Sequence, residues 1–393
     1  MTALNGIRIL DLTVFQQGPT ATVALADMGA EVIKIEEPVL GDPARAMTFS
    51  SDGDLPVNVY FETHNRNKKG ITLNLRKERG LEVLYRLVQK SDVFVHNLRP
   101  GVPERLRIDY QTLSGINPRL IYASASGWGS KGPDAHKPAF DNLAQVRAGT
   151  AYVIGEEGDP PMLVKIVGLA DWTGGISLLY GIMLALFNRE RTGMGQEVEA
   201  SLLGSQIWFG QLGLQRYLLS GHVPERLGLR RAGTPAADGK YLSSAAATDK
   251  MWLNFCKALG AEELATDPRF NTNLARQQNW QELRAITEPI IASKPRAEWV
   301  RLLEKFDVPC SAVQDYAEVA KDPQVLANEY IIDFDHPVMG PVKLVGLPTK
   351  LSRTPGKIRT AAPRLGEHTE EVLSQIGGYS AQEIGELRTE GVI

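Results

Sequence analysis

The sequence predicts an α/β fold with a largely parallel sheet that helices cover on both faces. Apolar strand patterns alternate with helical patterns from the start of the chain. Residues 7–12 are a predicted strand, 20–28 a helix of small residues closed by Gly29, and 31–36 the next strand, so the chain opens with a βαβ unit. The crossover of such a unit is right-handed, and continued alternation is typical of a parallel sheet between two helical layers.

Later segments continue the alternation. An amphipathic helix is predicted over 77–89, followed by strands at 92–95 and 120–124. The uncharged apolar run 176–187 predicts a buried helix, and 197–203 resumes the alternation of a strand. Because that run is shorter than the ~18 apolar residues of a membrane span, we expect it to lie in a protein core.

The chain length favours more than one domain. A loop-rich stretch at 220–235, with Arg226, Arg230 and Arg231, is followed by helical patterns at 250–259, 279–292 and 295–306. Residues 330–352 again look strand-like, and a closing helix begins at 369–376. We therefore expect a large domain over 1–224, a smaller one over 225–325, and a return of 326–393 to the large domain.

Composition argues against several classes of protein. A net charge of −3 over 393 residues gives no general attraction to nucleic acid or to acidic membranes. Only Cys256 and Cys310 are present, which rules out a disulfide framework and argues against a cysteine-based metal site. The first residues lack a basic region followed by an apolar one, so a cytoplasmic protein without a metal, a membrane partner or a nucleic acid partner is expected.

Asp171 is the most informative candidate for chemistry. It stands in Gly-Leu-Ala-Asp-Trp-Thr-Gly-Gly (168–175), directly ahead of the apolar run. Glycines beside a carboxylate let a ligand approach closely, because no Cβ blocks the way. The alternative is that Asp171 caps the helix, since aspartate is among the favoured N-cap residues.

The turn Gln16-Gln17-Gly18-Pro19 follows the first strand. It is not a G-x-G-x-x-G fingerprint, and no P-loop motif occurs in the chain, which argues against dinucleotide and nucleoside triphosphate sites. The turn nevertheless lies beyond the carboxyl end of a strand, where open α/β sheets bind ligands.

Together these segments resemble the class III CoA-transferases, of the CaiB/BaiF type that includes formyl-CoA transferase. The resemblance spans nearly the whole chain and rests on the blocks Leu10-Asp11, Gly18-Pro19, 29–36, 41–45, 65–70, 73–75, Asn97-Leu98-Arg99-Pro100-Gly101, 138–141, Ala170-Asp171, Ala185-Leu186, Arg189, Thr192-Gly193-X-Gly195-Gln196, 267–270 and 365–369.

The resemblance implies a fold, a reaction and a set of site residues. It implies a large domain with a Rossmann-like parallel sheet built from both chain ends, a smaller α+β domain, and an interlocked-ring homodimer. It makes Asp171 the nucleophile that accepts CoA from an acyl-CoA thioester before passing it to a small carboxylic acid. The tetrahedral oxyanions of such a reaction need hydrogen-bond donors, and backbone N–H groups or the Gln16 amide are the candidates. Coenzyme A is then a substrate rather than a permanently bound cofactor. The implied coenzyme contacts are Gln16, Leu73, Arg76, Asn97, Leu98, Arg105 and Lys137.

Local positive charge agrees with an anionic coenzyme. Lys68, Lys69, Arg76, Arg99 and Arg105 supply it on a slightly acidic chain, although any one of them could be a solvated surface cation. Glu37 departs from the resemblance, because the formyl-CoA transferases carry an arginine there for the nucleotide end. With an ordinary aspartate pKa near ~3.9, Asp171 would be ionised at neutral pH without a general base.

Two alternatives remain at the level of sequence. The same fold includes α-methylacyl-CoA racemases and CoA-ester isomerases, which pair a histidine with an aspartate in a G-H-D-x-N-Y context; here the stretch that follows His136 is Lys-Pro-Ala-Phe-Asp-Asn. A non-catalytic acyl-CoA-binding protein is the second alternative, and the intact Asp171 motif argues against it. The two acids that exchange CoA depend on pocket shape and are not readable from the sequence.

Overall fold

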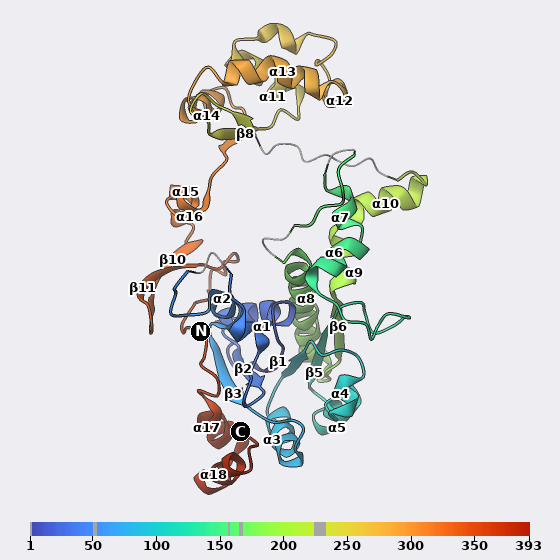
Figure 1. The fold of residues 1–393 in the computed structure, drawn as a ribbon, viewed down its shortest axis with the longest axis vertical. Coiled ribbons are helices and arrows are strands. Elements are labelled where there is room, and N and C mark those ends of the chain that lie inside the picture. Colours follow the sequence, from blue (N-terminus) through green and yellow to red (C-terminus); the bar gives the residue numbers. More distant parts are fainter. Residues whose placement is uncertain (1, 50–52, 156–157, 165–167, 224–232) are drawn as a thin grey trace. The chain divides into compact units, whose positions relative to one another are not determined.

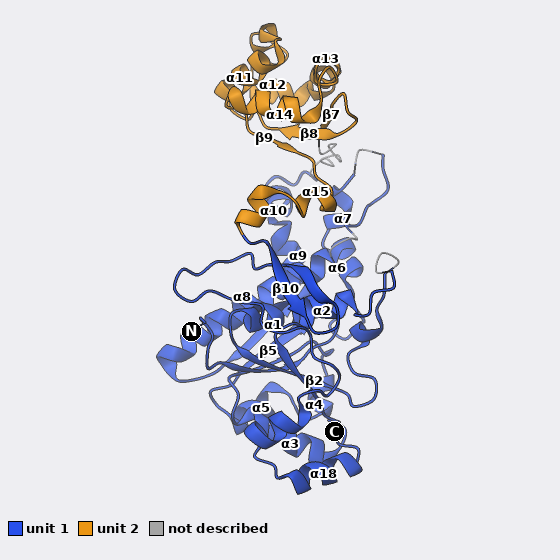
Figure 2. Cartoon of the chain, turned by 90° about the vertical axis from the view of Figure 1, so that its left-hand side faces the viewer, with its two compact units in different colours: residues 1–227, 329–393 blue, residues 228–328 orange. Residues whose placement is uncertain are grey.

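The computed structural model describes residues 2–49, 53–155, 158–164, 168–223 and 233–393 (Figure 1). The chain forms two compact units, the larger from residues 1–227 and 329–393 and the smaller from 228–328 (Figure 2). The arginines at 226, 230 and 231 lie outside the described residues. The assignment of coenzyme binding to the larger unit stays a prediction.

A six-stranded parallel sheet forms the centre of the larger unit. Its strand order is β3-β2-β1-β4-β5-β6. The strands are β1 (Arg8–Leu12), β2 (Glu31–Glu36), β3 (Lys68–Thr72), β4 (Val93–His96), β5 (Ile121–Ser126) and β6 (Glu197–Ser201). The expectations of a parallel sheet and of a large unit that contains both chain ends are confirmed. The strands of this sheet all precede residue 202, and the C-terminal segment joins the unit by packing against the sheet.

Two apolar layers sandwich the sheet, because alternate side chains of each strand point to opposite faces. Ile9 and Val93 face helices α1 (Gln17–Asp27) and α8 (Leu169–Thr192). Leu10 and Phe94 face the other layer. That layer contains helices α3 (Glu78–Val88), α5 (Tyr110–Ile116), α17 (Thr369–Val372), the π-helical turn η3 (Leu373–Gly377) and α18 (Ala381–Thr389) (Figure 1).

Strand β3 has no counterpart in the sequence-based prediction. It begins Lys-Lys-Gly, which lacks an apolar pattern. The side chain of Lys68 is nevertheless fully buried, because its Nζ donates to Asp11 Oδ2 at 2.9 Å and also to Thr22 and Asn65. A long-range ion pair therefore permits a strand that local composition does not suggest.

Helix α8 is longer and less buried than expected. It extends over 24 residues, and Ile176, Tyr180 and Phe187 are each more than half exposed. Among the described residues it is the one helix long and apolar enough to cross a membrane, with a mean hydropathy of 1.4 in its most apolar window. The prediction that the apolar run is too short for a membrane span was wrong, because the helix extends beyond the run at both ends. The core helix of a soluble protein can have the same length and composition.

The remaining elements complete both units. In the larger unit they are η1 (Pro43–Ala46), α2 (Val59–Asn65), α4 (Val102–Arg105), α6 (Asp141–Arg147), α7 (Thr150–Val153), α9 (Leu202–Phe209), α10 (Gln211–Ser220) and the antiparallel hairpin β10 (Ile331–His336) and β11 (Gly340–Val345). In the smaller unit they are β7 (Thr234–Pro235), β8 (Tyr241–Ser244), β9 (Cys310–Ala312), α11 (Asp249–Leu259), η2 (Glu262–Ala265), α12 (Asn273–Gln278), α13 (Trp280–Ile291), α14 (Arg296–Lys305), α15 (Tyr316–Val319) and α16 (Pro323–Ala327).

Candidate active site

Asp171 is the third residue of α8, at the carboxyl edge of the sheet. The N-cap of this helix is Gly168, whose φ of 58° is the left-handed conformation that glycine adopts freely. The capping alternative for Asp171 is therefore wrong. Its carboxylate does not close the helix, so it is available for another purpose.

The cap is supplied by a different helix. Asp141, the first residue of α6, accepts hydrogen bonds at Oδ1 from the backbone N–H groups of Ala170 at 2.6 Å and Asp171 at 3.2 Å. From α9, the buried Gln206 donates to Thr173 Oγ1 at 2.7 Å and to Leu169 O at 3.3 Å. These two side chains fix the first turn of α8 and hence the position of Asp171.

The environment raises the pKa of Asp171. Burial, followed by the negative charge of Asp141, brings that pKa to about 7. The positive end of the α8 dipole acts in the opposite direction and offsets part of the rise. The expectation of an ordinary aspartate pKa is thus wrong, because desolvation disfavours the charged form. A carboxylate with this pKa is more basic than a surface aspartate once it is ionised.

Gln16 lies against the start of α8. Its side chain is 7% exposed, and its Oε1 would be 2.6 Å from a Cβ placed on Gly168. The Tyr60 hydroxyl donates to the same Oε1 at 3.5 Å. A side chain at 168 would therefore displace the Gln16 amide from its place beside the Asp171 turn. The residue before α1, helix α2 and the first turn of α8, which are far apart in sequence, therefore lie close together.

Aromatic rings lie on the α2 side of Asp171. Tyr60 packs on His64 with ring centroids 4.9 Å apart, and His64 packs on Trp172 at 6.0 Å. Burial, and then the charge of Asp171, raises the pKa of Tyr60, so its hydroxyl stays protonated. Burial lowers the pKa of His64 to about 4, so its ring is neutral at physiological pH. The surroundings of Asp171 are therefore aromatic and, at Tyr60, able to donate a hydrogen bond.

The expected coenzyme contacts follow the carboxyl ends of several strands. Leu73 and Arg76 come after β3, Asn97 and Leu98 after β4, and Arg105 lies in α4. The side chains of Arg76 and Arg105 are exposed, and no ion pair with another described residue is found for them. Lys137 follows β5, is exposed, and pairs with Asp134 at 2.6 Å. These positions share the sheet edge at which α/β folds bind ligands.

Two of the expected contacts have other engagements in the structure. Leu73 is 2% exposed and belongs to the core. Asn97 directs both amide atoms to Val14, donating to its carbonyl at 2.7 Å and accepting from its N–H at 2.9 Å. A coenzyme contact by either residue stays a prediction.

The expected cluster of cations is smaller than the sequence suggests. Lys68 is buried in its pair with Asp11, so neither of the roles expected for it, surface cation or coenzyme contact, applies. Lys69 bridges Glu31 and Glu371 at 2.9 and 2.8 Å. Arg99 remains exposed. The Glu37 carboxylate accepts the N–H groups of Val39 and Leu40, so it closes a local turn.

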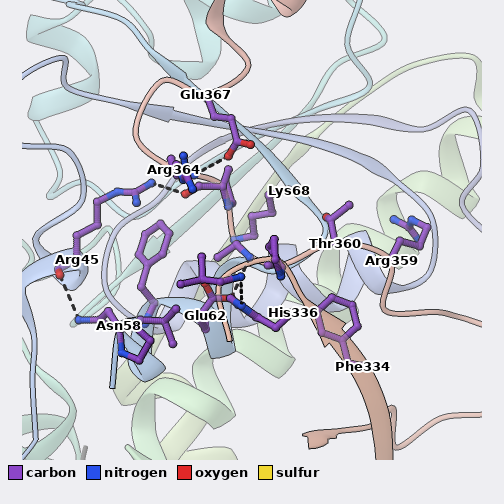
Figure 3. Close-up of a pocket in the computed structure, with 18 of the residues that line it drawn as sticks. Arg45, Asn58, Glu62, Lys68, Phe334, His336, Arg359, Thr360, Arg364 and Glu367 are labelled. Atoms are coloured by element: carbon purple, nitrogen blue, oxygen red, sulfur yellow. Dashed lines mark hydrogen bonds and ion pairs between the residues drawn. The ribbon is translucent and has the colours of Figure 1, made fainter. Parts of the chain in front are cut away.

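A separate cavity of about 720 Å³ lies between α2, β10 and the segment 359–368 (Figure 3). Neither Asp171 nor any of the seven expected coenzyme contacts lines it. Two side chains connect its walls. Arg45 forms a bidentate ion pair with Glu36 and donates to the carbonyl oxygen of Pro363. Glu62 accepts a hydrogen bond from the N–H of Ala362 at 2.9 Å and lies 3.6 Å from His336 Nε2. The cavity therefore belongs to the contact between α2 and the C-terminal return.

Asp141 and Gln206 are site residues that sequence reasoning missed. Asp141 occurs in a block of the resemblance, but nothing local indicates that it caps a helix 30 residues later. Tyr60 was also missed, because its approach to Asp171 depends on the packing of α2. Within the described part of the chain, no group of three or more His, Cys, Asp or Glu side chains is arranged to hold a metal.

Comparisons with known proteins agree with this fold. The sequence profile of CoA-transferase family III matches residues 4–369. An acetyl-CoA:oxalate CoA-transferase from Acetobacter aceti is 37% identical, with 92% of this chain and 93% of that protein covered. A succinyl-CoA:glutarate CoA-transferase from Mus musculus is 33% identical, with 100% and 91% covered. The crystal structure of a CAIB/BAIF family protein from Brucella suis matches with a TM-score of 0.84 at 32% identity, with 95% and 99% covered. The chain belongs to CoA-transferase family III and is a CoA-transferase enzyme.

Proposed function

We propose that this enzyme moves CoA from an acyl-CoA thioester to a small free carboxylic acid through a covalent intermediate on Asp171. The observation that carries the proposal is the placement of Asp171 in the first turn of α8. Asp141 caps that helix, so the Asp171 carboxylate does not serve as the cap. Relatives named as acetyl-CoA:oxalate and succinyl-CoA:glutarate CoA-transferases support the reaction class.

The proposed reaction has two mirrored halves. The ionised Asp171 attacks the thioester carbonyl, which forms a mixed anhydride and releases CoA thiolate. The thiolate attacks the aspartyl carbonyl, which gives an aspartyl-CoA thioester and releases the donor acid. The acceptor carboxylate then attacks that thioester and the steps run in reverse. A carboxylate nucleophile needs no general base at a pH above its own pKa, which for Asp171 is about 7.

Each half passes through tetrahedral oxyanions that need hydrogen-bond donors. The Gln16 amide and the Tyr60 hydroxyl both lie beside the Asp171 turn and have donor atoms. The N–H groups of Ala170 and Asp171 are already bonded to Asp141. We therefore assign the oxyanion role to Gln16, with Tyr60 beside it.

The coenzyme is proposed to lie along the carboxyl edge of the sheet, with its phosphates near Arg76 and Arg105. Alanine at either position should raise KM for acyl-CoA several-fold with little change in kcat, because a distant phosphate contact contributes equally to substrate and transition state. Steady-state kinetics with varied acyl-CoA measure this. Unchanged KM in both variants would move the nucleotide to another part of the edge.

The covalent intermediate is the decisive test of the mechanism. Incubation with a productive acyl-CoA and no acceptor should add the mass of CoA, less water, to the peptide that contains Asp171, as read by mass spectrometry. Hydroxylamine should inactivate the enzyme only when donor is present. A racemase would instead exchange the α-proton of a 2-methylacyl-CoA with deuterated solvent and form no adduct, and that result would overturn the proposal.

We also propose that the active form is a homodimer, with the interlocked rings that the resemblance implies. The support is an exposed apolar surface on the larger unit. Ile176, Tyr180, Leu184 and Phe187 form a stripe along α8, and the neighbouring α9 and α10 expose further large apolar side chains, among them Trp208, Phe209, Leu212, Leu218 and Leu219. Apolar surfaces of this extent are rare on monomers and are typical of interfaces.

A further inference from the structure

The loop between β1 and α1, residues 13–15, is held by side chains from several distant segments. It leads directly to Gln16, the residue to which the proposed function assigns the oxyanion role. Backbone amides and carbonyls in a connecting loop normally bond to water or to one another. In residues 13–15, nearly all of these backbone groups form hydrogen bonds with side chains.

The hydrogen bonds of this loop can be followed residue by residue. The Thr13 N–H donates to Asp11 Oδ1 at 3.0 Å, and the Thr13 carbonyl accepts from Lys34 Nζ at 2.8 Å. Both backbone groups of Val14 bond to the Asn97 amide. The Phe15 N–H donates to Asp42 Oδ1 at 3.1 Å. Every backbone N–H and C=O group of 13–15 except the Phe15 carbonyl therefore bonds to a side chain.

These contacts hold an unfavourable backbone conformation. Phe15 has a φ of 61°, in the left-handed region that aromatic residues rarely adopt. Strain of this kind persists only where the surroundings over-determine it, and it is concentrated at functional sites. The left-handed residue turns the chain just before Gln16, which reaches Gly168 and the Asp171 turn.

Lys34 and Asp42 form the centre of this arrangement. Their side chains are both 0% exposed, and Lys34 Nζ lies 2.8 Å from Asp42 Oδ2. The other Asp42 oxygen bonds to Phe15 and also to Ala44 N at 2.9 Å. A buried ion pair is a poor source of stability compared with apolar residues of similar volume, but it fixes geometry. A purely stabilising role would not require its hydrogen bonds to end on the loop beside Gln16.

We propose that the Lys34–Asp42 ion pair and Asn97 are positioning residues that lock the 13–15 loop and so hold the Gln16 amide at the reacting carbonyl. The proposal rests on the proposed function of Asp171 and Gln16. It assigns Asn97 to the loop rather than to the coenzyme. None of the three residues touches the reacting atoms; they act through Gln16.

The test is a double-mutant cycle in the full-length enzyme. Asp42→Asn keeps an oxygen that can accept from the Phe15 N–H but turns an NH₂ group toward Lys34. The ion pair is therefore lost, and with it the hydrogen bond from Lys34 Nζ to the Thr13 carbonyl. It should lower kcat about tenfold, with KM for acyl-CoA within about twofold of wild type. Gln16→Ala should lower kcat by about 100-fold. The double variant should be no slower than Gln16→Ala alone, because Asp42 acts through a side chain that is already absent.

Two further variants separate positioning from folding and from coenzyme binding. Asp27→Asn is the matched control, since Asp27 is buried and paired with Arg66 at 2.8 Å but does not contact the loop; its kcat should stay near wild type. Asn97→Ala should lower kcat without raising KM for acyl-CoA. If Asn97→Ala raised KM for acyl-CoA and left kcat unchanged, Asn97 would be a coenzyme contact and not a positioning residue.

Hydrogen–deuterium exchange supplies a readout independent of activity. In Asp42→Asn the amides of 13–15 should exchange at least about tenfold faster than in wild type, whereas Asp27→Asn should leave them unchanged. The locking role would be overturned if the kcat losses of Asp42→Asn and Gln16→Ala multiplied in the double variant, or if the amides of 13–15 exchanged at the wild-type rate in Asp42→Asn. If Gln16→Ala alone leaves kcat intact while exchange of the loop still accelerates in Asp42→Asn, the oxyanion assignment falls and the locked loop serves another group.

Discussion

At the scale of single residues, the environment of Asp171 determines its chemistry. An aspartate is normally ionised at neutral pH and weakly nucleophilic. Here burial and then the charge of Asp141 raise its pKa to about 7, so the folded protein holds the carboxyl partly protonated at neutral pH. The ionised form costs free energy, and that cost makes the carboxylate more reactive. The same property has consequences for stability and for the pH profile.

Asp171→Asn should abolish transfer and stabilise the protein at high pH. Because the folded-state pKa lies above the unfolded value of 3.8, wild-type stability from this group is lost as the pH rises from about 4 through about 7. The asparagine variant has no such loss, so at pH 8 it should exceed wild type by about 4 kcal/mol, and at pH 4 by less than about 1 kcal/mol. Thermal or urea unfolding at both pH values measures the difference; equal stability at pH 8 would contradict the raised pKa.

The rate of transfer should rise with pH through about 7, because Asp171, the proposed nucleophile, can attack a thioester only when it is ionised. Asp141→Asn keeps oxygen for the α8 cap but removes the neighbouring charge. Its acid limb should therefore move to lower pH, by about one unit. The measurement is kcat against pH at saturating acyl-CoA. An acid limb that stays in place would assign the titration to a group other than Asp171.

At the scale of elements, glycines set the distance between α1 and α8. A Cβ on Gly175 would lie 2.7 Å from both Gln17 O and Thr20 Cβ, and one on Gly174 would lie 2.8 Å from Gln17 Nε2. The two helices therefore approach more closely than side chains would permit. This close packing holds Gln16, just before α1, against the first turn of α8.

Gly175→Val should force α1 and α8 apart. We expect a loss of about 3 kcal/mol in the free energy of unfolding, from overpacking against backbone that cannot move freely. Gly385→Ala is the control, because Gly385 lies within α18 and a Cβ added there would meet no atom within 4 Å. Alanine there should stabilise by about 0.5–1 kcal/mol. Denaturant unfolding distinguishes the two; similar effects would show that α1 and α8 do not pack as described.

At the scale of the whole molecule, the exposed apolar surface of α8, α9 and α10 predicts self-association. Trp208→Glu, at a side chain 69% exposed, should weaken the dimer or prevent its formation, because a charge would then lie in an apolar interface. Leu274→Glu, at a side chain of α12 that is 65% exposed, should leave the oligomeric state unchanged. Sedimentation velocity over a range of concentrations measures both. A monomeric wild-type enzyme with full activity would contradict the proposed homodimer.

The sequence by itself determined the alternation of β1, α1, β2, α3, β4 and β5, because period-2 and helical apolar patterns are local properties of the chain. It also indicated Asp171 as the candidate nucleophile, since an aspartate among glycines before an apolar run stands out locally and matches a family block. Only the tertiary structure decided the rest. Strand β3 depends on the Lys68–Asp11 pair across 57 residues, the α8 cap on Asp141, and the pKa of Asp171 on burial. Each of these is an interaction between groups far apart in sequence, and its energy depends on a desolvated environment that exists only once the chain has folded.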